Sequence, residues 1–270
     1  MGKMLISNMR LLYSHYNLLI EFTKRDFLQR YKGSKLGFLW AILSPLLMLA
    51  VYSFIFVAVF KIKWANDVNS EDMMYTLMIF SALIPFNIFA ESVNRASAIL
   101  PQSANYIKKV VIPIEVLPIS IVLSTMINNL FSIVLLSLGK IIFLETPNWT
   151  LIFAPLAFIP ILLLSMGSAL FISALGVYLR DLTYVVSIAI NVIFYLSPVF
   201  YSSEIMPERF KFLLSVNPIA PIIEINRDIF IRGELFDGSS YLLSLLTSVV
   251  VLILGLSSFY YLRKGFADVI

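Results

Sequence analysis

The feature that most constrains this chain is a series of long apolar stretches that contain no charged residue. Six such stretches occur in the sequence, at residues 36–60, 73–90, 116–139, 146–179, 182–203 and 238–262. A helix needs roughly 20 apolar residues to cross the hydrocarbon core of a bilayer. Helices and closed barrels are the structures that satisfy their own backbone polar groups there. We therefore predict an all-α integral membrane protein with six transmembrane helices.

The composition agrees with a bilayer environment. Of the 270 residues, 60% are hydrophobic and 13% are charged, whereas a soluble domain is about 45–50% apolar and about 25% charged. No repeat or low-complexity linker divides the chain, so we interpret residues 1–270 as one transmembrane domain. Its parts are a cytoplasmic interface segment at 1–35, a six-span core at 36–262 and a cytoplasmic tail at 263–270.

The distribution of Lys and Arg predicts the orientation of the spans. Loops on the cytoplasmic side carry an excess of these residues. With six spans both termini lie on one side, and that side holds 13 of the 20 Lys and Arg residues. We therefore expect both termini in the cytoplasm. The pI of about 9.2 then reflects basic loops that face anionic lipid, and it does not indicate a nucleic-acid partner.

The N-terminal segment has the periodicity of an amphipathic helix. One face repeats at three- and four-residue steps, at Leu5, Met9, Leu12, Tyr16, Leu19 and Thr23. Charged residues such as Arg10, Glu21 and Lys24 fall on another face. Such a helix lies along the membrane surface with its basic face toward the lipid headgroups. A helix that packs on a partner protein shows the same pattern, and both interpretations can hold.

The segment between the fifth and sixth spans contains an apolar stretch that is too short to cross. This stretch, at residues 212–223, includes Pro218 and Pro221. We predict short re-entrant helices within residues 202–237, folded back into the outer leaflet. They would form an outer gate that involves Pro207, Asn217 and Pro218. A surface cap that never moves is the alternative.

The motifs that the sequence lacks argue against several functions. It has no G-x-x-x-x-G-K-[ST] loop, which would cradle the phosphates of ATP. No acidic residue lies deep inside a predicted span, whereas ion-coupled carriers keep ionisable groups there. There is no cysteine, and His15 is the single histidine. We therefore expect no catalytic residue, no metal site and no cofactor in this chain.

A basic segment precedes the first span. Residues 30–40 read R-Y-K-G-S-K-L-G-F-L-W, and Pro45 follows five residues later. Gly33 and Gly37 allow a tight turn, and Trp40 can anchor at the membrane interface. On physical grounds this is an elbow that joins a surface helix to a span. Positive-inside charge with an aromatic anchor explains it without any further role.

The elbow resembles the corresponding segment of permeases that export O-antigen, teichoic acid and capsule-like polysaccharides. These permeases belong to the type-two class of ABC exporters. Further blocks are similar to that family in order and spacing, at residues 105–110 (N-Y-I-K-K-V), Pro113, Glu115, Leu117, Pro118, Arg180, Asp181, Ser197, Pro198, Val199, Asn217, Pro218, Arg227 and Gly233. Ile114 departs from the family pattern, because Arg is expected before Glu115. The resemblance extends from about residue 25 to residue 233.

The resemblance implies a function and a set of partners. Such permeases pair as homodimers, and two ATP-binding cassette subunits that hold ATP and Mg dock beneath them. Their cargo is a polysaccharide on an undecaprenyl-pyrophosphate lipid, which crosses the bacterial inner membrane. O-antigen is favoured here over teichoic acid or capsule. An ABC permease for a lipid or drug is one alternative, and a membrane enzyme or scaffold that transports nothing is another.

Two candidate sites follow from the resemblance and the charges together. The elbow offers Arg30, Lys32 and Lys35 to the pyrophosphate of an incoming substrate, since Arg presents a planar fork to phosphate oxygens and Lys a point charge. The positive-inside rule alone also accounts for these three residues. The segment after the second span offers candidates for coupling to the ATPase, namely Asn105, Tyr106, Ile107 and Lys108. An ordinary loop with no partner is the alternative there.

Overall fold

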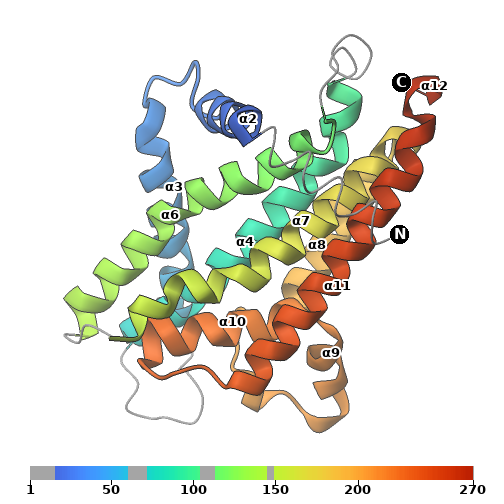
Figure 1. Ribbon diagram of the computed structural model, residues 1–270. Helices are drawn as coiled ribbons and strands as arrows, with labels where there is room; N and C mark the ends of the chain where they lie inside the picture. The colour runs from blue at the N-terminus through green and yellow to red at the C-terminus, as the bar shows by residue number, and fades with distance from the viewer. Residues whose placement is uncertain (1–15, 60–71, 104–112, 145–148, 270) are drawn as a thin grey trace.

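The computed structural model describes residues 16–59, 72–103, 113–144 and 149–269. All regular structure within those ranges is helical, which confirms the all-α prediction. The main helices are α2 (Tyr16–Gln29), α3 (Trp40–Tyr52), α4 (Asp72–Gln102), α6 (Val116–Leu144), α7 (Ala154–Tyr178), α8 (Leu182–Leu196) and α11 (Gly238–Leu262) (Figure 1). Short helical turns extend them, namely η1 (Gly37–Leu39), η2 (Ser53–Val59), η3 (Trp149–Phe153), η7 (Arg263–Gly265) and α12 (Phe266–Val269).

Five helical stretches in the described part of the chain are long and apolar enough to cross a membrane. They are Gly37–Phe56, Met73–Gln102, Val116–Phe143, Trp149–Tyr178 and Gly238–Gly265. The remaining predicted span, at 182–203, is shorter than expected because α8 ends at Leu196 after 15 residues. Ser197 adopts an extended conformation there, as residues before a proline usually do. The total of six spans stays a prediction.

The second span is longer than its apolar pattern indicates. The charge-free stretch ends at residue 90, yet α4 continues to Gln102 and carries Glu91 and Arg95 inside the helix. These two side chains pair with charges from the elbow segment, so the helix does not have to end where they begin. The boundary drawn at the first charge was therefore wrong.

The helices form a bundle with two distinct ends (Figure 1). The α2 end holds α2, the last turns of α4, the start of α6 and α12. The α10 end holds the short helices η4 (Ser203–Ile205), η5 (Glu208–Phe210), α9 (Lys211–Val216), α10 (Ile219–Arg227) and η6 (Asp228–Arg232). The two short α-helices α9 and α10 thus lie within residues 202–237, and their insertion into the outer leaflet stays a prediction.

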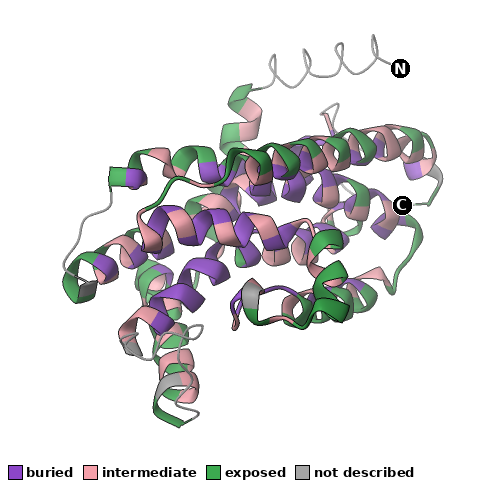
Figure 2. Ribbon diagram, turned by 90° about the horizontal axis from the view of Figure 1, so that it is seen from below, coloured by how far each residue is buried: buried purple, intermediate pink, exposed green. Residues whose placement is uncertain are grey.

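The core lies around α4, and burial falls off toward α3. In α4 78% of the most apolar window is buried, against 6% in the first span. Figure 2 shows buried residues on the inner faces of the helices and exposed residues on their outer faces. Helices α7 and α11 meet backbone to backbone, since a Cβ added to Gly255 would lie 2.1 Å from the Gly167 carbonyl oxygen. Small residues permit such close approach in membrane helices.

Helix α2 packs against its own chain rather than standing free. Leu19 and Phe22 contact the apolar cluster at the α2 end, and Thr23 is buried with its hydroxyl donating to the Leu19 carbonyl at 2.8 Å. Tyr16 is 59% exposed, so the predicted face is only partly covered. Its earlier members, Leu5, Met9 and Leu12, lie outside the described residues.

Candidate functional site

A polar cleft of about 410 Å³ lies among α3, α4, α6 and α8. Its polar lining is Ser44, Asn87, Glu91, Asn94, Asn128, Asn129, Ser132 and Asn191. Asn87 is exposed although its immediate neighbours on α4, from residue 75 to 86 and at 88 and 89, are all buried. Amide groups are costly to leave in hydrocarbon without partners. The cleft therefore suits water or a polar cargo within the span region.

Aromatic rings share the lining of this cleft. Tyr52, Phe80, Phe86 and Phe194 border it, and the rings of Phe86 and Phe194 stand 4.8 Å apart. Amides donate and accept hydrogen bonds, as sugar hydroxyls require, while ring faces can stack on the apolar C–H faces of a pyranose. The lining therefore combines the two surface types that a glycan needs.

Sequence reasoning missed the cleft, although a signal was present. Asn87, Glu91 and Asn94 recur at four- and three-residue steps along α4, and on α6 Asn128 and Asn129 precede Ser132 by four and three residues. Such spacing puts side chains on one face of a helix. The polar face of each helix is visible in the sequence, but the sequence does not show that four helices meet around the cleft.

The elbow connects to α4 through a cluster of four charged residues, which are Asp26, Arg30, Glu91 and Arg95. Arg30 donates to the Glu91 carboxylate, and Arg95 donates to Asp26 at 2.5 Å. Two contacts in the cluster are looser, at 3.9 Å between Arg30 and Asp26 and at 3.7 Å between Arg95 and Glu91.

Arg30 is the best-connected member of this cluster. It also donates to the Thr125 hydroxyl at 2.8 Å and to Ser124 at 3.3 Å, both on α6. Its side chain is 15% exposed, and this burial lowers the pKa of its guanidinium, while the Glu91 carboxylate acts in the opposite direction. The predicted phosphate ligand thus already holds partners within the chain.

The two other predicted phosphate ligands are placed differently. Lys32 and Lys35 are both exposed. Lys32 lines a groove of about 950 Å³ beneath α2, together with Gln29, Gln102 and Ser103 and the apolar side chains of Ile99, Leu117 and Ile121. Lys35 does not line it. The three predicted residues therefore do not converge on one point.

The predicted coupling residues Asn105, Tyr106, Ile107 and Lys108 lie outside the described residues. The segment that follows them is anchored by Glu115, which is buried at the start of α6. Glu115 accepts hydrogen bonds from the Tyr260 hydroxyl at 3.0 Å and from Arg263 at 3.2 Å. Arg263, which follows α11, thus supplies a positive charge to the buried Glu115.

At the α10 end, Asn217 joins the start of α10 to the end of α8. Its side-chain oxygen accepts from the Ile219 amide at 3.0 Å, and its side-chain nitrogen donates to the Ser197 hydroxyl at 2.8 Å. Pro218 precedes the first residue of α10, and Pro207 precedes η5. Asn217 and Pro218 thus start α10, while Pro207 belongs to a separate turn.

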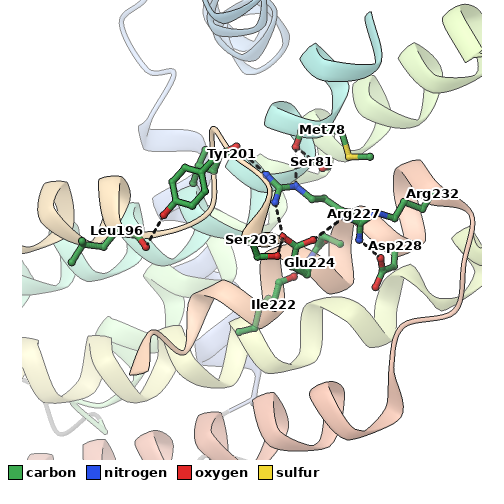
Figure 3. A network of polar contacts seen from close by, with 12 residues as sticks. Met78, Ser81, Leu196, Tyr201, Ser203, Ile222, Glu224, Arg227, Asp228 and Arg232 are labelled. Carbon is green, nitrogen blue, oxygen red and sulfur yellow. Dashed lines mark hydrogen bonds and ion pairs between the residues drawn. The ribbon is translucent and has the colours of Figure 1, made fainter. Parts of the chain in front are cut away.

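Arg227 ties α10 to the core. Its side chain is fully buried, and it donates to Glu224 at 2.8 Å, to the Val199 carbonyl at 3.0 Å and to the Met78 carbonyl at 3.4 Å (Figure 3). Arg232 adds bonds to Glu224 and Asp228. This one guanidinium therefore binds residues of α4, of the segment after α8 and of α10. Sequence reasoning named Arg227 only as a family marker.

Two side chains, one on α6 and one on η3, bind the short helix η6 that follows α10. The buried Lys140 donates to the Ile231 carbonyl, and the Thr150 hydroxyl donates to the Ile229 carbonyl at 2.7 Å. Both carbonyls belong to η6, so a cation and a hydroxyl satisfy backbone acceptors at a helix end. The α10 end is consequently bonded on several sides.

Comparison with known proteins agrees with this architecture. The model of the ABC-2 type transporter family matches residues 17–231. An O-antigen export system permease protein RfbA from Klebsiella pneumoniae is 32% identical over 94% of this chain and 95% of its own length. One from Myxococcus xanthus is 29% identical over 98% of this chain and 99% of its own. The polysialic acid transport protein KpsM of Escherichia coli is 24% identical over 86% of this chain and 88% of its own length.

The match to the family model covers the elbow, the cleft and most of the α10 end. The family model begins inside α2 and ends inside η6. Members of the family are multi-pass transport subunits, and ATP hydrolysis belongs to a separate component. The resemblance drawn from the elbow and the later motifs is confirmed at the level of the family. The chain is a member of the ABC-2 type transporter family.

Proposed function

We propose that this chain is the permease of an ATP-driven exporter that moves a polysaccharide, with O-antigen favoured, across the bacterial inner membrane. The observation that carries the proposal is the cleft lined by amides and aromatic rings within the spans of an ABC-2 type chain. The printed functions of the similar proteins, O-antigen export and polysialic acid transport, support it. Teichoic acid, capsule and a lipid or drug are the alternative cargoes.

The proposal includes partners. Two copies of the chain pair as a homodimer with both termini in the cytoplasm, and two ATP-binding cassette subunits supply ATP and Mg. The first span supports the pairing, since 6% of its apolar window is buried within one chain and the cleft lies against it. Asn105, Tyr106, Ile107 and Lys108 contact the ATPase in this scheme.

The polymer arrives on undecaprenyl-pyrophosphate at the groove beneath α2. The groove has an apolar floor for a lipid and an exposed Lys32 at its edge, with Lys35 nearby in the elbow. Arg30 completes the proposed phosphate site when it exchanges its internal partners for the pyrophosphate. At the opposite end, re-entrant helices close the exit, with Asn217 and Pro218 between α9 and α10 and Pro207 at the turn before η5.

The test is export by the complete complex in lipid vesicles. The permease and its ATPase are reconstituted, and ATP-dependent movement of lipid-linked O-antigen is measured. Asn87→Leu with Asn191→Leu should lower export at least tenfold while assembly persists, because the cleft loses two amides. Ser137→Leu is the matched control, since Ser137 lies on α6 but does not line the cleft. A wild-type complex that moves no glycan contradicts the proposal.

A further inference from the structure

The groove beneath α2 and the polar cleft are separated by directly bonded side chains. Asp26 and Tyr31 line the groove, whereas Glu91 and Asn128 line the cleft. Arg30 contacts both carboxylates, and the Tyr31 hydroxyl donates to the Asn128 side chain. Polar contacts therefore join the groove-lining residues to the cleft-lining residues, and together these residues form the partition between the two cavities.

Two buried polar atoms in this partition lack a hydrogen-bond partner among the described residues. They are one carboxylate oxygen of Asp26 and one terminal nitrogen of Arg95. Their nearest opposite charges are the looser contacts at 3.9 Å and 3.7 Å. A buried ion pair contributes little net stability, but its members must keep some partner of opposite charge. The cluster is thus suited to exchange one anion for another.

The elbow beside the cluster can accommodate such an exchange. Gly33 and Gly37 have φ angles of +88° and +50°, which side chains rarely adopt. No atom lies within 4 Å of a Cβ built at either position. The segment that carries Arg30 is therefore joined to the next helix by a glycine turn.

We propose that Asp26, Arg30, Glu91, Arg95, Tyr31 and Asn128 form a gate between the groove and the cleft, which a lipid pyrophosphate opens by replacing Glu91 as the partner of Arg30. Pyrophosphate offers the guanidinium fork a bidentate anion of higher charge than a carboxylate. Loss of the Arg30–Glu91 contact lets the groove-lining residues move away from the cleft-lining residues, and the groove and cleft then form one route. This inference rests on the proposed function, because it takes a pyrophosphate-linked cargo as the trigger.

The first experiment measures access to the cleft from the groove side. Asn87→Cys places a single thiol in a chain that has no other cysteine. A bulky impermeant thiol reagent is applied to the cytoplasmic face of the reconstituted complex. A polyprenyl pyrophosphate without glycan should raise the labelling rate at least tenfold, and an equal amount of phosphatidylglycerol should not. Equal stimulation by both lipids, or by neither, overturns the pyrophosphate trigger.

A second variant tests the role of the charges. In the same background, Glu91→Gln should raise labelling at least tenfold without any lipid, because the neutral amide binds Arg30 less strongly. Arg227→Lys, which alters a cation at the α10 end, is the control and should leave labelling of folded protein unchanged. Labelling by Glu91→Gln at the wild-type rate overturns the gate.

The third experiment locks the gate shut. Tyr31→Cys with Asn128→Cys, joined by a cleavable bifunctional thiol reagent, should reduce export at least tenfold, and cleavage should restore it. The control is Tyr178→Cys with Leu262→Cys, which lie at the static contact where the Tyr178 hydroxyl donates to the Leu262 carbonyl at 2.6 Å. Undiminished export with the gate fully crosslinked overturns the proposal.

The outcomes separate this inference from the proposed function. A wild-type complex that exports no glycan, but whose cleft opens with polyprenyl pyrophosphate, contradicts the cargo and supports the gate. A Tyr31→Cys, Asn128→Cys complex that exports glycan with the gate crosslinked contradicts the gate and supports the cargo.

Discussion

Each end of the bundle holds an arginine bonded to a glutamate, but the surroundings of the two pairs differ. Arg227 at the α10 end is fully buried and also donates to backbone carbonyls of Val199 and Met78. Arg30 at the α2 end is bonded to side chains alone, next to an incompletely satisfied Asp26 and a glycine turn. Backbone acceptors fix a position, whereas side-chain acceptors can be exchanged. Arg227 is therefore fixed to the backbone, whereas Arg30 has the kind of partners that the proposed exchange requires.

The largest expected effect is the loss of stability when Arg227 is removed. Arg227→Met deprives the carbonyls of Val199 and Met78 of their donor and leaves Glu224 with Arg232 alone, which should destabilise the fold by about 2–4 kcal/mol. Arg30→Met should have an effect of about 1–2 kcal/mol, since Arg95 still neutralises Asp26 and Glu91. Thermal unfolding in detergent measures both. Equal losses would remove the distinction between the two ends.

The static middle of the bundle supplies a second comparison. Gly255→Ala puts a Cβ 2.1 Å from the Gly167 carbonyl oxygen, so α7 and α11 must separate. Overpacking of this kind should lower stability by about 1–3 kcal/mol. Gly238→Ala on the same helix meets open space and is the control. Unfolding temperatures that fall equally in both variants would show that the α7–α11 contact is not close-packed.

Charge exchange distinguishes the two pairs in assays of export and folded yield. Arg30→Glu should lower export at least tenfold, because Glu91 and Asp26 then repel the new carboxylate. Adding Glu91→Arg should restore an opposite-charge contact and with it the folded yield, but not export, because a carboxylate at residue 30 cannot bind pyrophosphate.

The same exchange at the α10 end should fail. Arg227→Glu with Glu224→Arg leaves the Val199 carbonyl facing a carboxylate, so folded yield should stay low. Recovery of folded yield there to the extent seen with the Arg30 pair would contradict the difference between the two ends.

The smallest expected effect concerns an exposed lysine in the groove. Lys32→Gln should reduce ATP-dependent export about three- to fivefold without a change in unfolding temperature, in line with ~1 kcal/mol for one cation near anionic lipid. Lys211→Gln at the α10 end is the matched control, because Lys211 is also exposed and pairs with Glu208. A loss of export that is the same in both variants would remove any special role for the groove.

The sequence by itself determined the helical membrane class, the family and most span boundaries. The clearest case is α11, whose bounds of Gly238 and Leu262 coincide with the charge-free stretch. Asp237 explains the agreement, since it is exposed and caps the helix by accepting from the Ser240 amide at 2.9 Å. Hydrogen bonds from Ser239 and Ser240 lower the pKa of Asp237 to about 2. Where a charge is solvated beside a span, it marks the end of the helix.

Tertiary contacts decided the features that the charge pattern did not give. Glu91 and Arg95 lie inside α4 because charges 60 to 70 residues away, Arg30 in the elbow and Asp26 in α2, neutralise them. The amides of the cleft come from helices far apart in the sequence, so their spacing along each helix could not show that they meet. Arg30 looked like a free cation for the same reason. A sequence specifies which groups a helix carries on each face, but pairing between distant helices determines which of those groups remain available to a ligand.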